Sequence, residues 1–186
     1  NTGRSAIAAS GVDNTSIAAV NGFQASTYYS NVELWNGSNW TETTDTNTTS
    51  VSGRGGVGVS NTSTLVFGGS INGAPPTANV ELWNGSNWTE VANMNSARTR
   101  SMSFGTSNTA ALVAGGEGGP PGQLVEVYNG TSWSETTDMS TARSNTASGA
   151  GSTTAGLVAG GQSGGSKIAT TEEWTNGPLT QTFTDS

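Results

Sequence analysis

The residues that could do chemistry in this 186-residue chain are few, and the most versatile types are missing. The chain has 13 acidic and six basic side chains, no histidine and no cysteine. Histidine is the commonest general base and metal ligand, and cysteine supplies disulfides, thiol nucleophiles and thiolate metal sites. We therefore expect no cofactor. The net charge of −7 argues against nucleic acid as a partner, because phosphate binding depends on lysine and arginine.

Charged residues recur at fixed positions along the chain. Four glutamates each stand two residues before an aromatic residue: Glu33, Glu81, Glu126 and Glu172. Arginines recur at a second position, as Arg4, Arg98 and Arg143. This spacing favours structural pairing, in which each glutamate accepts hydrogen bonds from an arginine or from backbone N–H groups between repeated units. The alternative is a ring of carboxylates that binds a cation or a sugar at a central axis.

The glutamates belong to a repeated motif, NVELWNGSNWTE, which is present at residues 31–42 and, letter for letter, at 79–90. A looser copy, LVEVYNGTSWSE, covers residues 124–135, and a degraded copy, TTEEWTNGPLTQ, covers 170–181. Alternating side chains in the first half are typical of a strand, and strand-favouring residues fill the second half. Asn84-Gly85 between them can supply the two positive-φ residues of a tight turn, so the motif predicts a β-hairpin.

Each hairpin carries two large apolar residues. In three copies they are aromatic and five positions apart, and in the last copy a tryptophan is followed by a leucine: Trp35/Trp40, Trp83/Trp88, Tyr128/Trp133 and Trp174/Leu179. We interpret these pairs as packing between neighbouring units. An exposed platform that stacks on a ligand is the alternative.

A second landmark, a strand of small and aliphatic residues that ends in a glycine pair, precedes each hairpin. The pairs are Gly68-Gly69, Gly115-Gly116 and Gly160-Gly161, with Asn21-Gly22 at the equivalent place in the first unit. A Gly- and Ser-rich segment upstream of each pair predicts a further short strand that would fit where strands crowd at an axis. Each unit is thus predicted to hold four strands, within a single domain of residues 1–186. The approximate units are 1–46, 47–94, 95–139 and 140–186.

Four antiparallel strands repeated about every 46 residues are typical of the blade of a β-propeller. The predicted fold class is therefore all-β, with four blades of four antiparallel strands. Two arrangements fit this pattern, a four-bladed propeller or four blades of a larger ring. The first is favoured because both ends of the sequence fall at unit boundaries.

The glycine pair together with the Glu-x-aromatic…Trp pattern resembles the kelch repeat, and the resemblance covers the whole chain. The aromatic spacing is shorter than in animal kelch proteins. Four segments are also similar to kelch-like repeats in predicted tail or fibre proteins of marine tailed phages, notably cyanophages. They are NMNSARTR (93–100), DMSTARSN (138–145), GSTTAGLVAGG (151–161) and the ending TTEEWTNGPLTQTFTDS (170–186). This resemblance implies location in a virion, with other virion proteins or further copies of the chain as partners.

Three functions are considered in order of preference. The first is a non-catalytic structural or attachment protein of a marine phage, on a tail or head fibre, that contacts a glycan or protein on the host surface. The second is a secreted, lectin-like carbohydrate-binding propeller, and the third is a glycan-cleaving enzyme. No apolar run is long enough to span a membrane.

Catalysis is disfavoured by the residues that known propeller enzymes need. The copper oxidase among kelch-type propellers needs histidine and cysteine, which are absent here. Sialidase-like propellers need an arginine cluster, a tyrosine nucleophile and an acid. Arg98, Arg100 and Tyr28 are present, but their spacing does not indicate that they converge.

Recognition is expected in the segments that differ between units, since loops on a fixed scaffold usually carry specificity. These segments link the second and third strands of each unit, at residues 22–30, 70–78, 117–123 and 162–170. The candidate recognition residues in them are Phe23, Tyr28, Tyr29, Asn72, Glu117 and Lys167. The three aromatic residues among them suit glycan stacking, protein contact or packing against their own unit.

Overall fold

The computed structural model describes residues 3–49, 51–72, 74–118, 122–145, 148–176 and 181–185. Over these residues the chain is all β, as the sequence predicts, and the paired strands are antiparallel. The described residues form no helix, so none of them belongs to a helix that could cross a membrane.

Each of the four predicted units contains one four-stranded sheet, whose strands lie side by side in chain order. The first sheet consists of β1 (Ala8–Ser10), β2 (Ile17–Val20), β5 (Val32–Trp35) and β6 (Trp40–Thr43). The second consists of β8 (Gly55–Ser60), β9 (Ser63–Phe67), β11 (Val80–Trp83) and β12 (Trp88–Glu90). The third consists of β13 (Met102–Ser107), β14 (Ala110–Ala114), β15 (Val125–Tyr128) and β16 (Trp133–Glu135). The fourth consists of β17 (Ser148–Gly151), β18 (Ala155–Ala159), β21 (Thr171–Asn176) and β22 (Gln181–Asp185).

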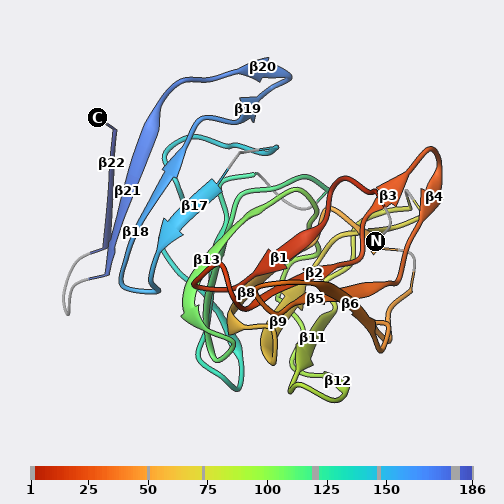
Figure 1. Ribbon diagram of the computed structural model, residues 1–186. Coiled ribbons are helices and arrows are strands. Elements are labelled where there is room, and N and C mark those ends of the chain that lie inside the picture. The colour runs from red at the N-terminus through yellow and green to blue at the C-terminus, as the bar shows by residue number, and fades with distance from the viewer. Residues whose placement is uncertain are drawn as a thin grey trace.

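Short two-stranded sheets lie in the connections outside these four sheets. Their strands are β3 (Phe23–Gln24) with β4 (Thr27–Tyr28), β7 (Val51–Ser52) with β10 (Ser70–Ile71), and β19 (Gln162–Ser163) with β20 (Ser166–Lys167). The first and last of these are hairpins between the second and third strands of a unit (Figure 1). They therefore occupy the variable segments in which recognition is predicted.

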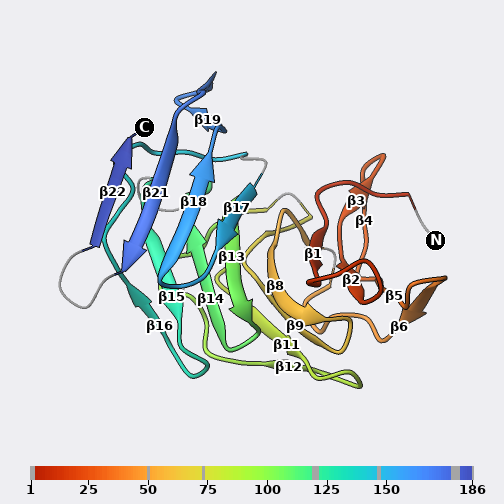
Figure 2. The same ribbon diagram turned by 60° about the vertical axis from the view of Figure 1, so that its left-hand side comes forward.

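The first strands of successive sheets lie next to one another, β1 beside β8, β8 beside β13 and β13 beside β17. Small residues allow this approach, since a Cβ on Gly56 would lie 3.1 Å from the carbonyl oxygen of Ala9. Residues of all four first strands line one groove, but among the described strands no comparable packing joins β17 to β1. Figure 2 shows the four sheets following one another along an open arc, with the first and fourth sheets at its ends.

Apolar joints hold neighbouring sheets together. Ala18 and Val20 of the first sheet belong to one buried cluster with Trp83 and Trp88 of the second. The equivalent clusters at the next two joints include Leu65, Phe67, Tyr128 and Trp133, and then Leu112, Ala114, Val158 and Trp174. Both aromatic residues of the second and third hairpins, and Trp174 of the fourth, thus pack between units, which confirms that interpretation for these residues.

The hairpin turns differ from the two-residue form that the sequence predicts. Pairing of the two tryptophans leaves a four-residue loop, in which Gly85 has a φ of 93° and Asn84 keeps a negative φ. The Oδ1 atom of Asn84 closes the loop by accepting hydrogen bonds from the N–H groups of Ser86 and Asn87, both at 2.9 Å. The equivalent residues that do the same are Asn36 and Asn129.

The fourth hairpin has a different register from the other three. Trp174 pairs with Phe183, so the two positions are nine residues apart instead of five. The expected equivalence of Leu179 is therefore wrong, and Leu179 itself lies outside the described residues.

The glycine pairs turn the chain out of the second strand. Gly68 and Gly69 have φ values of 66° and 96°, and a Cβ on Gly68 would lie 2.5 Å from the carbonyl oxygen of Arg98. Asn21, which replaces the first glycine in the first unit, adopts the same left-handed region at φ 57°. The other pairs with positive φ are Gly115-Gly116 and Gly160-Gly161. Each pair directs the chain towards a variable loop.

Candidate functional site

Each repeated glutamate is buried and paired with an arginine. The pairs are Arg4–Glu33 at 2.9 Å, Arg54–Glu81 at 2.9 Å, Arg98–Glu126 at 2.5 Å and Arg143–Glu172 at 2.6 Å. This is the structural pairing that the recurrence of the charges predicts. None of these carboxylates lines the groove between the four first strands, so the alternative of an axial carboxylate ring is wrong for the described residues.

The third unit shows how each ion pair is embedded. Glu126 accepts hydrogen bonds from the backbone N–H groups of Asn95 (2.7 Å) and Ser96 (3.1 Å), which lie on the segment entering the unit. Arg98 also donates to the carbonyl oxygen of Leu124 (2.8 Å). Burial lowers the pKa of Arg98, and the charge of Glu126 opposes this effect. The network ties the entering segment to the third strand of the same sheet.

The second unit forms its ion pair with an arginine that sequence periodicity missed. Val51 stands at the repeat position of Arg98, and Arg54, three residues later, supplies the guanidinium. Its Nη1 donates to Glu81 (2.9 Å) and to Asn21 Oδ1 (3.3 Å), while its buried Nε and Nη2 have no partner among the described residues. Burial lowers the pKa of Arg54, against the opposing charge of Glu81.

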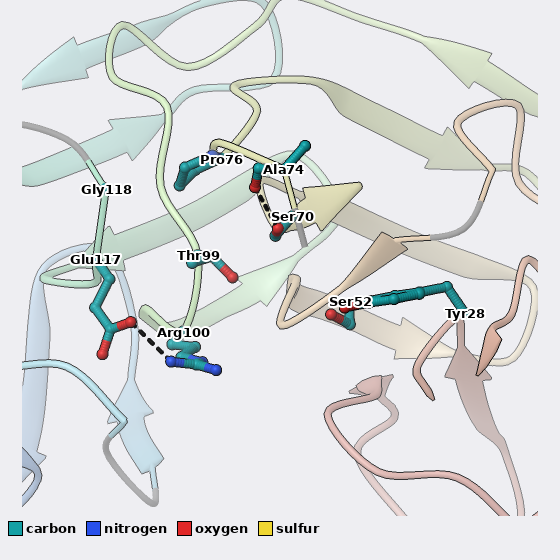
Figure 3. A pocket seen from close by; sticks show the side chains of 9 residues that line it. All are labelled: Tyr28, Ser52, Ser70, Ala74, Pro76, Thr99, Arg100, Glu117 and Gly118. Carbon is teal, nitrogen blue, oxygen red and sulfur yellow. Dashed lines mark hydrogen bonds and ion pairs between the residues drawn. The ribbon is translucent and has the colours of Figure 1, made fainter. Parts of the chain in front are cut away.

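A pocket of about 330 Å³ opens between the loops beside these ion pairs. It is lined by Tyr28, Ser52, Ser70, Ala74, Pro76, Thr99, Arg100, Glu117 and Gly118. Figure 3 shows Tyr28 and Ser52 on one side of the pocket and Arg100 with Glu117 on the other. The lining residues come from the first three units, so no single unit forms the site.

A series of backbone hydrogen bonds links the units beside this pocket. Gly53 (φ 67°) donates its N–H to the carbonyl oxygen of Ala6 (3.0 Å), and Arg100 (φ 55°) donates its N–H to that of Gly53 (2.9 Å). Asn145 (φ 51°) in turn donates to the carbonyl oxygen of Arg100 (3.1 Å). The left-handed backbone at each step fixes the direction in which the Arg100 side chain leaves the chain.

An exposed ion pair forms one wall of the pocket. Arg100 Nη1 donates to Glu117 Oε2 at 2.8 Å, and the other carboxylate oxygen accepts from Ser144 Oγ (3.0 Å) and Asn145 Nδ2 (2.7 Å). The side chains of Arg100 and Glu117 are 56% and 38% exposed. Exposed ion pairs contribute little to stability, so this one acts mainly to position polar groups.

The structure brings two of the six predicted recognition residues, Tyr28 and Glu117, into the pocket lining. Phe23 stacks on Tyr28 with 5.6 Å between ring centroids, and therefore supports the tyrosine from its own hairpin. Tyr29 is half-buried and lies outside the lining. Of the three aromatic residues, Tyr28 thus faces the pocket and Phe23 packs against it.

Two of the predicted recognition residues lie elsewhere on the surface. Asn72 and Lys167 are exposed but do not line this pocket. Arg100 and Tyr28 do line the same pocket, although their spacing gave no sign that they converge, whereas Arg98 is buried in its ion pair. The lining residues missed from the sequence are Ser52, Ser70, Ala74, Pro76, Thr99, Arg100 and Gly118. Four of them, Ser70, Ala74, Pro76 and Gly118, lie in the variable segments where recognition is predicted, and the other three lie beside the repeated arginine position at the start of a unit.

The pocket suits hydrogen bonding to a polar ligand. The Ser52 hydroxyl can donate and accept. The hydroxyls of Ser70 and Thr99 donate to the carbonyl oxygens of Ala74 (2.6 Å) and Gly53 (3.3 Å) and can still accept. The Arg100 guanidinium has further N–H donors besides the one on Glu117. Over the described residues, no three acidic side chains gather as they would around a metal ion. No protein-family model matches the chain, and no curated protein matches it at a significant level. Function is therefore inferred from the pocket and the repeats.

Proposed function

We propose that this chain is a non-catalytic binding scaffold, a kelch-like β-propeller array that presents a recognition pocket on its loops. The observation that carries the proposal is the contrast between buried and exposed charges. Pairs such as Arg98–Glu126 are enclosed within the sheets, whereas Arg100–Glu117 is exposed at a pocket between loops. A rigid frame that holds polar groups on loops is typical of a recognition site.

A glycan or a similarly hydroxylated ligand fits the chemistry of the pocket best. The Tyr28 ring offers an apolar surface for stacking on a sugar ring. Ser52 and Thr99 offer hydroxyl groups, and Arg100 offers planar, charged donors. The volume of about 330 Å³ lies at the lower end of the range for small-molecule sites. A short segment of a surface glycan is therefore the proposed ligand.

The proposed setting is the virion of a marine tailed phage, on a tail or head fibre beside other virion proteins. The kelch-like segments around Arg98 and Arg143 support this setting, because they are the part of the sequence that resembles such phage proteins. A secreted lectin-like propeller is the second candidate, and the same pocket supports it. Glycan cleavage is disfavoured because the lining of the pocket contains one carboxylate, Glu117, whereas glycosidases use two that flank the bond to be cleaved.

Binding of the intact chain to a glycan array and to marine cyanobacterial cells tests the proposal. Tyr28→Ala and Arg100→Asn should each reduce binding at least about tenfold, as expected for loss of a stacking or charged contact. Asparagine is chosen because Asn145 adopts the same left-handed backbone at the equivalent position. Lys167→Ala, outside the pocket, is the control and should bind as the parent chain does.

Two results would contradict the proposal. Equal binding by the parent chain and both pocket variants would show that the pocket does not recognise the ligand. Absence of binding to every glycan and cell type would remove the attachment function. The virion setting has its own test, since tail and capsid genes beside the gene for this chain are expected, and their absence would favour the secreted lectin.

A further inference from the structure

The first sheet exposes aromatic side chains that are buried in the inner sheets. Trp40 is 37% exposed, whereas its counterparts Trp88 and Trp133 are 7% and 6% exposed. Its neighbour Trp35 is half-buried, whereas Trp83 is fully buried. The aromatic face, defined by Trp35 and Trp40, is thus uncovered by any other sheet of the described chain.

The fourth sheet exposes the opposite kind of face. Leu157 is 40% exposed, although Leu65 and Leu112 at the equivalent positions are fully buried. Ala159 is also exposed, whereas Ala114 is fully buried. The aliphatic face, defined by Leu157 and Ala159, therefore lacks the neighbour that covers it in the second and third sheets.

The inner joints show that these two kinds of face fit each other. Leu112 and Ala114 of the third sheet share a buried cluster with Trp174 of the fourth. Phe67 of the second sheet meets Trp133 of the third edge-on, with 5.2 Å between ring centroids. Each inner joint therefore sets the aliphatic face of one sheet on the aromatic face of the next. The arc ends with one free face of each kind.

The indole N–H groups indicate the same kind of neighbour. Trp88 Nε1 donates to the carbonyl oxygen of Thr44 (3.1 Å), and Trp133 Nε1 donates to that of Ala92 (3.0 Å). Both acceptors lie on the segment that leaves the preceding sheet. Trp40 Nε1 has no acceptor within the described ranges. A sheet placed on the aromatic face could supply one.

We propose that a second copy of this chain covers these faces, with the aliphatic face of one copy on the aromatic face of the other. The first and fourth sheets, which carry the two faces, lie at opposite ends of the arc (Figures 1 and 2), and the described β17 and β1 are not packed together as the other first strands are. The contact is head-to-tail and continues the joints already present within the chain. Two copies can bury both kinds of face twice and close into a symmetric pair.

Glu173 sets the strength of this association. It pairs with Leu157 and so shares the aliphatic face, where the inner sheets have Leu82 and Val127 packed at their joints. A carboxylate loses hydration when the face is covered, which weakens association and keeps the free face soluble. Glu173→Leu restores the inner pattern and should lower the dissociation constant at least about tenfold, because burial of a leucine side chain is worth more than the free energy of one decade.

Sedimentation of the intact chain at increasing concentration tests the proposal. A species of twice the 18.7 kDa chain mass is expected for the parent, and at lower concentration for Glu173→Leu. Trp40→Glu and Leu157→Glu should each remain monomeric with an unchanged circular dichroism spectrum, because both side chains are exposed in one copy. Val59→Glu is the matched control, since Val59 is 37% exposed but lies on neither face, and it should dimerise like the parent.

Mixing the two disrupted variants identifies the geometry. Trp40→Glu retains its aliphatic face and Leu157→Glu retains its aromatic face, so the mixture should form a one-to-one dimer through the single intact joint. A mixture that stays monomeric, or a Trp40→Glu variant that still dimerises alone, would overturn the head-to-tail contact. A parent chain that is monomeric at all concentrations would overturn association altogether. If both substitutions then lowered the free energy of unfolding of that monomer equally, the two faces would be packed against each other within one chain.

Discussion

Arg54 and Glu81 form a 2.9 Å salt bridge whose two side chains are fully buried, although Arg54 is three residues out of phase with the other repeated arginines. The missing side chain of Gly69 makes this possible, because a Cβ there would lie 2.7 Å from Arg54 Cγ. Glu81 also accepts hydrogen bonds from the backbone N–H groups of Asn47 and Thr48, at 2.7 and 3.2 Å. The carboxylate with its two backbone donors, more than the position of the arginine, is therefore the constant feature of the second, third and fourth units.

Replacing Glu81 with glutamine should destabilise the fold by about 3–5 kcal/mol, because it leaves the buried guanidinium of Arg54 without a counter-charge. Urea denaturation followed by circular dichroism measures the change. Glu90→Gln is the matched control, since Glu90 is directly opposite Glu81 in the sheet but exposed, and its cost should stay within about 0.5 kcal/mol. A loss below about 1 kcal/mol for Glu81→Gln would contradict the structural role of the pair.

An arginine at position 51, which matches the other units, should restore part of the stability that is lost when Arg54 is removed. Arg54→Ser alone should destabilise the fold by about 3 kcal/mol or more, because Glu81 would lose its partner charge. Val51→Arg combined with Arg54→Ser places the guanidinium where Arg98 and Arg143 stand, from which each of those reaches its glutamate and backbone carbonyls. The double variant should therefore unfold at higher urea than Arg54→Ser. Equal midpoints for the two variants would show that an arginine at position 51 cannot replace Arg54 as the partner of Glu81.

Local sequence patterns foresaw the strands and the pairing of repeated charges, because both depend on short-range alternation and fixed spacing. The turn form was mispredicted because Asn84 closes its loop through its side chain, a contact that the Asn-Gly dipeptide does not reveal. Arg54 was missed because its role depends on the space left by Gly69, which belongs to another strand end. Features that depend on contacts between distant segments could therefore not be predicted from the spacing of the sequence repeat.

The pocket illustrates the same limit. Tyr28 and Glu117 were foreseen because they stand in loops that break the repeat. Arg100 was not assigned to recognition, because its exposure follows from left-handed backbone and from a hydrogen bond to Gly53 in the preceding unit. Asn72 shares its loop with three lining residues but does not itself line the pocket, and the loop of Lys167 contributes no lining residue. The composition of a loop showed that the loop differs between units, but it did not show which of its side chains face the pocket.

Gly156→Ala should destabilise the joint between the third and fourth sheets. A Cβ at this position would lie 2.3 Å from Cε2 of Phe104, which packs over Gly156 and Gly149. Overpacking of this kind costs about 1–3 kcal/mol. Combining Gly156→Ala with Phe104→Leu should cost less than the sum of the single changes, since the smaller side chain relieves the clash. Additive costs in thermal unfolding would mean that the phenylalanine and the glycine do not share this contact.

Tyr128 should make the fold sensitive to alkaline pH. Burial raises the pKa of its phenol above the ordinary value of about 10. The unfolded chain therefore loses this proton at lower pH than the folded chain does. The contribution of the buried phenol to the free energy of unfolding is complete below about pH 10. It falls as pH rises through the pKa of the folded state, by up to about 1.4 kcal/mol per pH unit. Tyr128→Phe keeps the ring but removes this dependence, so its unfolding midpoint should fall less steeply between about pH 9.5 and 11 than that of the parent. Identical slopes for the parent and Tyr128→Phe would show that the phenol meets water in the folded chain and that the third hairpin does not close over it.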